Sequence, residues 1–277
     1  MTLDTRLKRH SFRCQGKEVA IYWSVAPRPV EKSQSNDAVP KQKLRLASSP
    51  DKNGSPKYLP PVIYLNIYGD EGMQIAEELL AVSDRDFVLV TISGLDWNRD
   101  MSPWDAPSIS KESQPSTGGA DEYLKVLTDE IIPRTEAWLA GEYLDTGGQD
   151  SPPDTVVPVW RGIAGYSLAG LFAIYSLYKT AVFDRAASIS GSLWFPHFKD
   201  YAENHALAKK PDRLYFSVGD REARTRNQYL KTVQVNTEEL ADYYRSLSVE
   251  VKYELNEGNH FNHEVKRTVK GLAWLLE

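Results

Sequence analysis

The sequence predicts an α/β fold, in which a mostly parallel central sheet is covered by helices on both faces and begins with an antiparallel hairpin. Two features support this. Strand-length apolar runs alternate with segments of helical periodicity over most of the 277 residues, which is the pattern of parallel sheets with crossover helices. The first apolar segments instead flank a short polar turn at residues 15–17, which is typical of a hairpin.

The N-terminal hairpin consists of residues 10–14 and 18–27, which read HSFRC and EVAIYWSVAP. Residues 31–57 then break the pattern, because they are rich in Ser, Pro, Lys, Asp and Asn. We expect them to form a flexible surface loop. No internal repeat or second core pattern divides the chain, so we expect a single domain over residues 1–277.

After this loop, strands and helices alternate. We expect strands where short apolar runs are bounded by turn residues, at residues 60–69, 86–93, 156–165, 185–190, 213–219 and 249–255. We expect helices where apolar residues recur every three or four positions, at residues 73–83, 120–139, 168–178, 227–247 and 264–276. Pro133 is expected to kink or split the second helix, because proline has no backbone N–H. In such folds reactive groups collect at the carboxyl ends of the strands.

Composition and charge argue against several functions. The formal net charge of −5 gives no reason to expect nucleic acid or an anionic membrane as a partner. Cys14 is the only cysteine, which excludes an internal disulfide and a multi-cysteine metal cluster. The chain has no glycine-rich phosphate-binding motif, and HFNHE at residues 260–264 matches no zinc-protease motif. We therefore expect no metal and no cofactor.

The N-terminal residues lack the apolar segment of a secretion signal, and no uncharged apolar run approaches the roughly 20 residues that span a bilayer. We therefore expect a soluble, cytoplasmic protein. The sequence carries no signal for the oligomeric state.

A serine stands between small residues at the point where a buried strand becomes a buried helix. Residues 161–170 read RGIAGYSLAG, with Ser167 between Gly165 and Ala169. A tight turn that projects its central residue needs such small neighbours. The stretch is close to the nucleophile elbow G-x-S-x-G, with the last glycine displaced by one position to Gly170. We predict that Ser167 is a nucleophile; the alternative is that it only caps the helix.

A serine hydroxyl needs a base to take its proton and a carboxylate to orient that base. His260 and His263 lie between the last expected strand and the closing helix, where the chain order Ser, acid, His places the base. We predict His260 as the base and expect His263 to begin the helix. The loop after the preceding strand offers Asp220 and Glu222 as the acid, with Glu222 preferred. The alternative is that both carboxylates only favour the N-terminus of the next helix.

Acyl transfer also requires hydrogen-bond donors for the oxyanion of the tetrahedral intermediate. The N–H of Leu168, directly after the serine, is one predicted donor. The second is expected in the loop NIYGDEG at residues 66–72, most simply at Gly69 or Asp70. By itself, a glycine in this position also fits an ordinary turn.

Several longer segments resemble a known family. They are PPVIYLNIYG (60–69), NRDMSPW (98–104), GGADEYLKVLTDEIIP (118–133), the run from GIAGYSLAG to SGSLWFP (162–196), LYFSVGDRE (214–222) and EGNH (257–260). In this order and spacing they resemble the putative esterase family of α/β-hydrolases, from Pro61 to Leu276. That family includes enterochelin esterases and other siderophore trilactone hydrolases, feruloyl and acetylxylan esterases, S-formylglutathione hydrolases and mycolyltransferases.

Within the family, SGSLWFPH (190–197) and GDRE (219–222) are most similar to the siderophore esterases. The resemblance implies an α/β-hydrolase fold and places the catalytic serine, histidine and acid on Ser167, His260 and Glu222. The chain departs from the family at Tyr68, where an aspartate is usual. It also departs at Ala169, the first of two positions that are usually glycine.

The resemblance implies a serine esterase that hydrolyses a carboxylic ester through an acyl-enzyme. Its substrate would be a small-molecule ester such as a siderophore trilactone or its iron complex, or a related aromatic ester. Arg99 is a candidate for binding a catecholate or phenol oxygen, or it pairs with Asp100. Trp104 and Trp194 are candidates for stacking on an aromatic acyl group, or they belong to the core. The alternatives are an esterase of feruloyl or acetyl carbohydrate esters, and a non-catalytic protein that binds a small ligand.

Overall fold

An eight-stranded sheet forms the centre of the molecule. The computed structural model describes residues 7–24, 58–110, 113–143 and 157–277, and the expected surface loop at residues 31–57 lies outside them. In spatial order the strands are β1 (Leu7–Cys14), β2 (Lys17–Ser24), β5 (Val88–Ser93), β4 (Val62–Asn66), β9 (Arg161–Tyr166), β10 (Arg185–Ile189), β11 (Arg213–Gly219) and β12 (Glu250–Asn256).

The sheet is antiparallel at one edge and parallel elsewhere. β2 runs antiparallel to both β1 and β5, and every neighbouring pair from β5 to β12 is parallel. The β1–β2 turn has positive φ at both Gln15 and Gly16. Positive φ at both central residues is required by the two-residue hairpin turn whose twist matches that of the flanking strands. This confirms the predicted parallel sheet with its N-terminal hairpin.

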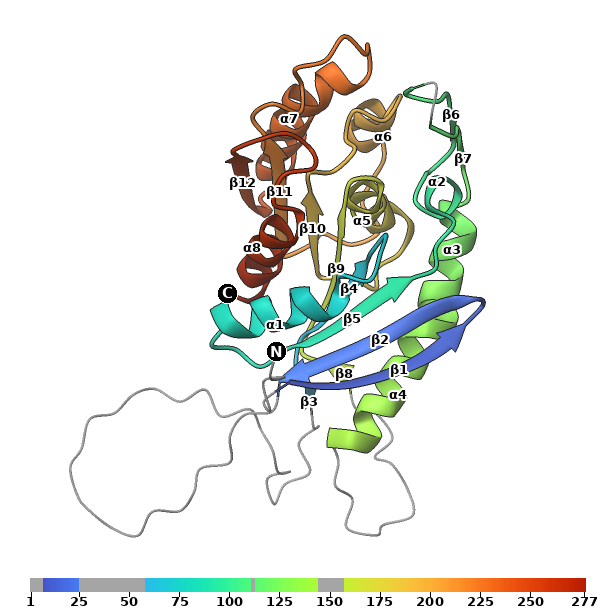
Figure 1. Cartoon of the computed structure of the whole chain (residues 1–277), viewed down its shortest axis with the longest axis vertical. Helices are drawn as coiled ribbons and strands as arrows, with labels where there is room; N and C mark the ends of the chain where they lie inside the picture. Colours follow the sequence, from blue (N-terminus) through green and yellow to red (C-terminus); the bar gives the residue numbers. More distant parts are fainter. Residues whose placement is uncertain (1–6, 25–57, 111–112, 144–156) are drawn as a thin grey trace, which may run out of the picture.

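Helices cover both faces of the sheet (Figure 1). In β4, Ile63 and Leu65 pack in one apolar cluster with α1 (Gly72–Val82) and α8 (Glu264–Leu276). Tyr64, between them, packs in the opposite cluster with α3 (Ala120–Val126), α5 (Leu168–Lys179) and α7 (Val233–Ser246). Successive side chains of a strand point to opposite faces, so both faces of this strand are buried.

The helix expected at residues 120–139 is split, as its proline predicted. It consists of α3 (Ala120–Val126), a π-helical turn (Leu127–Ile131) and α4 (Ile132–Tyr143). Pro133 lies in the first turn of α4. Because proline cannot donate a backbone hydrogen bond to the residue four positions earlier, the wider π turn fits directly before it.

The helix expected at residues 227–247 starts later than predicted. A 3₁₀ turn (Leu230–Thr232) precedes α7, which ends at Ser246. Asn227 lies outside the helix because its side-chain Oδ1 accepts hydrogen bonds from the N–H groups of Tyr229 and Leu230. An asparagine that binds nearby N–H groups in this way favours a turn over a helix interior.

Short elements that the sequence pattern did not predict complete the fold. They are the helices α2 (Trp97–Asp100) and α6 (Phe198–Asn204), the strand pair β3 (Tyr58–Leu59) with β8 (Val157–Pro158), and the strand pair β6 (Asp105–Ala106) with β7 (Ser116–Thr117). The strand expected at residues 156–165 is thus divided between β8 and β9.

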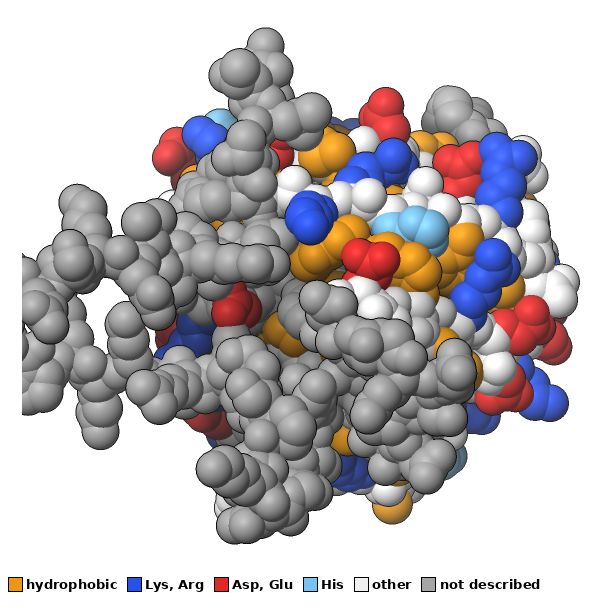
Figure 2. All heavy atoms as spheres, turned by 90° about the horizontal axis from the view of Figure 1, so that it is seen from below, with side chains coloured by type: hydrophobic (Ala, Val, Ile, Leu, Met, Phe, Trp, Pro, Cys, Tyr) orange, Lys and Arg blue, Asp and Glu red, His pale blue; other side chains and the backbone are white. Residues whose placement is uncertain are grey.

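Charged side chains of both signs are mixed on the described part of one face of the molecule (Figure 2). On the face drawn in Figure 2, Lys and Arg lie close to Asp and Glu, so the part of this face that is described carries no extended area of one charge. Among the described residues, none of the helices has the length and apolar character to cross a membrane.

Candidate active site

Ser167 occupies a strained turn between β9 and α5. Its φ of 59° and ψ of −126° are costly for a residue with a side chain, by about 1–3 kcal/mol. Backbone contacts hold this conformation, because the N–H of Ser167 donates to the Ile189 carbonyl and its own carbonyl accepts from the N–H of Ser192. The hydroxyl makes no capping hydrogen bond to α5. The turn therefore presents the side chain of Ser167 away from the helix.

The small residues of this turn are required by close packing. A Cβ on Gly165 would lie 2.4 Å from the Cβ of Ala169, and a Cβ on Gly170 would lie 2.9 Å from the Gly165 carbonyl oxygen and 3.0 Å from the Cα of Gly191. The strand end and the first turn of α5 thus approach as closely as the backbone allows. This is the physical reason for the small residues around Ser167.

His260 lies beside the serine hydroxyl. Its Nε2 is 3.1 Å from Ser167 Oγ, and its backbone carbonyl accepts a hydrogen bond from the hydroxyl of Tyr166. Burial raises the pKa of Tyr166, so this hydroxyl stays a donor at neutral pH. His263, which was expected to begin the helix, is the N-cap residue directly before α8 and has a left-handed conformation.

Glu222 is the carboxylate that contacts His260. Its Oε2 lies 2.7 Å from His260 Nδ1, and its Oε1 accepts from the N–H of Gly219 at 2.6 Å. Burial acts to raise the pKa of Glu222, but the hydrogen bond and charge of His260, the Gly219 N–H and the Ser190 hydroxyl hold that pKa below its usual range. Asp220 instead accepts from the Gly258 N–H and steadies the loop before His260.

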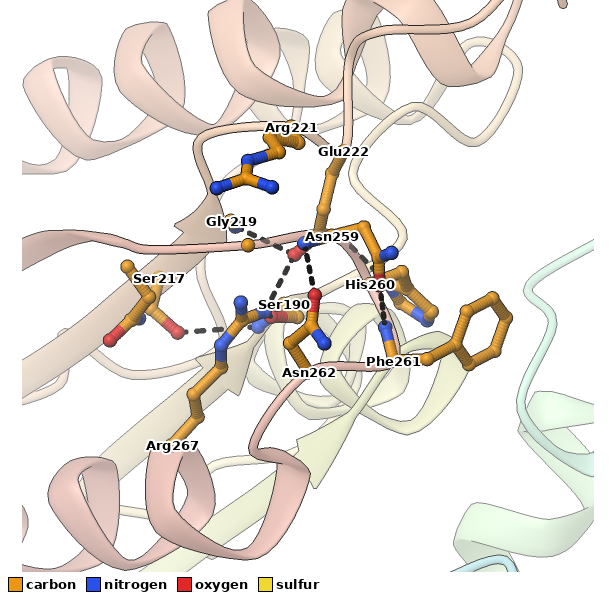
Figure 3. Close-up of polar contacts among 12 residues, drawn as sticks. Ser190, Ser217, Gly219, Arg221, Glu222, Asn259, His260, Phe261, Asn262 and Arg267 are labelled. Carbon is orange, nitrogen blue, oxygen red and sulfur yellow. Dashed lines mark hydrogen bonds and ion pairs between the residues drawn. The ribbon is translucent and has the colours of Figure 1, made fainter.

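Sequence reasoning missed Arg267, which Figure 3 shows reaching from α8 toward Ser190 and Glu222. Its side chain is 2 % exposed and its Nη1 lies 3.0 Å from Glu222 Oε1. The available signal was an arginine within the mainly apolar buried face of the closing helix, because arginine is rarely buried without a partner.

A pocket of about 490 Å³ opens beside Ser167 and His260. Aromatic side chains contribute much of its wall, and two of them, Phe261 and Tyr68, are 79 % and 77 % exposed. Tyr68 stands edge-on to Trp97, with ring centroids 5.3 Å apart. The lining residues are Leu65, Asn66, Ile67, Tyr68, Gly69, Glu71, Ile75, Trp97, Tyr166, Ser167, His260, Phe261, Glu264, Val265 and Thr268. Sequence reasoning had not singled out Trp97, Tyr166 or Phe261.

The three residues predicted to supply oxyanion donors, Leu168, Gly69 and Asp70, differ in their position relative to the pocket. Leu168 begins α5, where the first backbone N–H groups have no partner within the helix. Gly69 lines the pocket, and its N–H donates to the Glu71 carboxylate at 3.1 Å. Asp70 faces a second hollow beside the N-terminal hairpin, so the structure does not bring it to Ser167.

The two predicted substrate-binding side chains do not line this pocket. Arg99 donates to Asp100 at 2.9 Å, which is the ion pair considered as the alternative. Trp194 packs against Phe195, with ring centroids 6.0 Å apart, and against the core. Trp104 donates its indole N–H to the Pro196 carbonyl. Among the described residues, no three His, Cys, Asp or Glu side chains form a group that could hold a metal ion.

Comparisons with known proteins identify the family of the chain. A family model described as putative esterase matches residues 39–267. An uncharacterized protein of Bacillus subtilis, YbbA, is 24 % identical over 239 residues, which cover 79 % of this chain and 90 % of that protein.

Solved structures share the fold over nearly the whole chain. The siderophore hydrolase EstB from Aspergillus nidulans is 17 % identical with a TM-score of 0.62, and the match covers 99 % of this chain and 95 % of EstB. An IroE-like serine hydrolase from Shewanella oneidensis is 18 % identical with a TM-score of 0.64, covering 97 % and 80 % of the two chains. These matches confirm the α/β-hydrolase fold that the sequence predicted.

Proposed function

Because this chain belongs to the putative esterase family, we propose that it is a serine esterase in which Ser167, His260 and Glu222 form the catalytic triad. The supporting observation is the continuous chain of contacts from Ser167 Oγ through the His260 ring to Glu222, at 3.1 and 2.7 Å. This chain opens onto the pocket. A nucleophile, a base and an orienting acid within hydrogen-bond distance are the arrangement that activates a serine hydroxyl.

In the first half of the reaction, Ser167 Oγ attacks the ester carbonyl carbon while His260 Nε2 takes the hydroxyl proton. Glu222 stabilises the imidazolium that forms. The oxyanion of the tetrahedral intermediate accepts from the Leu168 N–H, and from the Gly69 N–H once the Glu71 carboxylate has left it. The C–O bond to the leaving alcohol then breaks, and His260 returns its proton to that alcohol.

In the second half, water enters beside His260 and attacks the acyl carbon of the Ser167 ester. His260 takes one proton from this water, and a second tetrahedral intermediate forms at the same N–H groups. Its collapse releases the carboxylic acid, and the proton on His260 returns to Ser167 Oγ. The free enzyme is restored with one ester and one water consumed.

For the substrate, we propose a siderophore trilactone or a related ester with an aromatic acyl group. The exposed rings of Tyr68 and Phe261, with the half-buried ring of Trp97 beside them at the pocket, provide faces and edges on which an aromatic group can stack. The similarity to the siderophore hydrolase EstB and to an enterobactin esterase from Shigella flexneri supports the same substrate class. The cytoplasmic location stays a prediction.

The test is initial-rate hydrolysis of short p-nitrophenyl esters and of a ferric trilactone siderophore. We expect wild-type protein to hydrolyse an ester, and Ser167→Ala and His260→Ala each to lose about a thousandfold or more in kcat. Feruloyl and acetyl sugar esters run in parallel would identify a carbohydrate esterase if they are preferred. Wild-type inactivity on every ester, or an unchanged rate in Ser167→Ala, would favour the non-catalytic binding protein.

A further inference from the structure

Arg267 is a buried cation in the first turn of α8. Its Nη1 lies within hydrogen-bond distance of Glu222 Oε1, Ser190 Oγ and Tyr166 OH, at 3.0, 2.9 and 3.3 Å. Its Nη2 donates to the Glu257 carbonyl at 2.8 Å. A buried guanidinium is costly to desolvate, so a side chain with these contacts is expected to have a specific role.

The two oxygens of the Glu222 carboxylate have different partners. Oε1 accepts from Arg267 and from the Gly219 N–H, while Oε2 is left for His260 Nδ1. A carboxylate held at one oxygen by two donors on different elements cannot rotate freely. The other oxygen therefore points at the imidazole ring in a fixed direction.

The same guanidinium also contacts the elements that carry the base and the nucleophile. Tyr166, which precedes Ser167 in the chain, accepts from Arg267 and donates to the His260 carbonyl. Glu257 stands at the start of the loop that carries His260. Arg267 thus contacts the acid, the loop of the base and the strand of the serine at once.

We propose that Arg267 is a positioning residue that holds Glu222 ionised and aimed at His260. The proposal rests on the proposed function, since it concerns the same triad. Arg267 does not line the pocket, so it acts through Glu222 rather than by touching substrate. Its loss is expected to lower kcat while KM changes little.

Because Arg267 Nη1 lies 3.0 Å from Glu222 Oε1, we also expect its charge to affect the pH dependence of the site. The charged and titratable groups around Glu222 and His260 are Tyr166 of β9, Asp220 and Arg221 of the loop after β11, Glu257, and Glu264 and Arg267 of α8. The active form needs Glu222 ionised and His260 neutral. Removal of a nearby cation favours protonation of this pair. In a variant that lacks the Arg267 charge, the Glu222–His260 pair should therefore bind its first proton at a higher pH than in wild type.

The experiment measures the rate at which a fluorophosphonate labels Ser167, by intact mass, from about pH 5 to pH 9. Wild type, Arg267→Met and Arg267→Lys are compared below their melting temperatures. For Arg267→Met we expect the maximal rate to fall at least about tenfold and the acidic limb to move up by about one pH unit. Arg267→Lys keeps the positive charge, so its limb stays at the wild-type position, although its rate falls because one ammonium cannot replace the planar guanidinium.

Arg161→Met is the matched control. Arg161 binds Glu136 through two hydrogen bonds of 2.6 and 2.7 Å, at the opposite end of β9 from Ser167. Its loss removes a hydrogen-bonded arginine–glutamate pair that is less buried than the Arg267–Glu222 pair, and we expect lower stability with an unmoved acidic limb. A merely structural Arg267 would behave in the same way as this control.

The outcomes separate the two proposals. An unlabelled wild-type Ser167 would overturn the serine esterase and, with it, the role of Arg267. A labelled wild type with an unmoved limb in Arg267→Met overturns only the positioning role. If Arg267→Met does not fold, Arg267→Lys decides, because a wild-type labelling rate in that variant contradicts the need for a guanidinium.

Discussion

At Glu222, burial and hydrogen bonding shift the pKa of the same carboxyl in opposite directions. Its side chain is 4 % exposed, which acts to raise its pKa, and the contacts with His260, Gly219 and Ser190 more than offset that effect. A carboxyl whose pKa is lowered by folding contributes stability above its unfolded pKa and loses it as the pH falls through the folded value. The site therefore contributes to the acid sensitivity of the whole fold.

We predict that Glu222→Gln lowers the free energy of unfolding at neutral pH by about 3 kcal/mol, because Arg267 then loses its buried charge partner. The difference from wild type should shrink as the pH falls through the lowered pKa of Glu222 in the folded protein, because the wild-type carboxyl then takes up a proton and glutamine does not. Urea unfolding of both proteins at several pH values measures this difference. A constant difference down to the acid transition would show that Glu222 does not carry a lowered pKa.

At the level of elements, the crossing of β9 and α5 tolerates no extra atom at Gly165. A Cβ there would lie 2.4 Å from both the Cβ and the carbonyl carbon of Ala169. We predict that Gly165→Ala destabilises the protein by about 3 kcal/mol, and that adding Ala169→Gly does not restore stability, since the backbone contact remains. Thermal unfolding of the single and double variants measures both effects.

Gly141, in α4, provides the matched control for this substitution. A Cβ at Gly141 would meet nothing within 4 Å, and alanine is the better helix former by about 1 kcal/mol. Gly141→Ala should therefore stabilise the protein slightly. Similar stability changes in Gly141→Ala and Gly165→Ala would contradict the close approach of strand and helix.

Periodicity predicted the main elements of the site, because buried strands and helices of this length leave strong apolar patterns. It placed the Ser167 turn between β9 and α5 and placed His260 before α8. Boundaries were less predictable where side chains compete with the backbone, as Asn227 does before α7. The choice of Glu222 over Asp220 became clear only in the structure, because both lie in one loop and only the fold shows which one reaches His260.

The whole molecule brings together residues that the sequence keeps far apart. Ser167 follows β9, Glu222 follows β11 and His260 follows β12, and these strands are parallel members of one sheet. Alternation along the chain predicted that they share the carboxyl edge of the sheet. Strand order did not follow from the pattern, and neither did the pocket wall, because Trp97 and Phe261 come to line the same pocket as Ser167 only through the fold.

The charge of the pocket predicts which esters it accepts. Glu71 and Glu264 line it, and the described lining residues include neither lysine nor arginine; the chain as a whole carries a formal charge of −5. We predict that an uncharged aromatic ester has a kcat/KM about tenfold above that of the same ester bearing a carboxylate on its acyl group, and that salt reduces this ratio by screening. Paired substrates assayed at low and high ionic strength measure it.

The variant that isolates this effect is Glu71→Gln combined with Glu264→Gln, because both changes remove a charge while keeping the size of the side chain. The ratio should fall toward one in this variant, mainly through faster turnover of the anionic ester. Lys270→Gln, on the same helix as Glu264 but outside the pocket lining, should leave the ratio within about twofold of wild type. A wild-type preference for the anionic ester would mean that cations outside the described lining govern recognition, and it would favour an acidic substrate for this site.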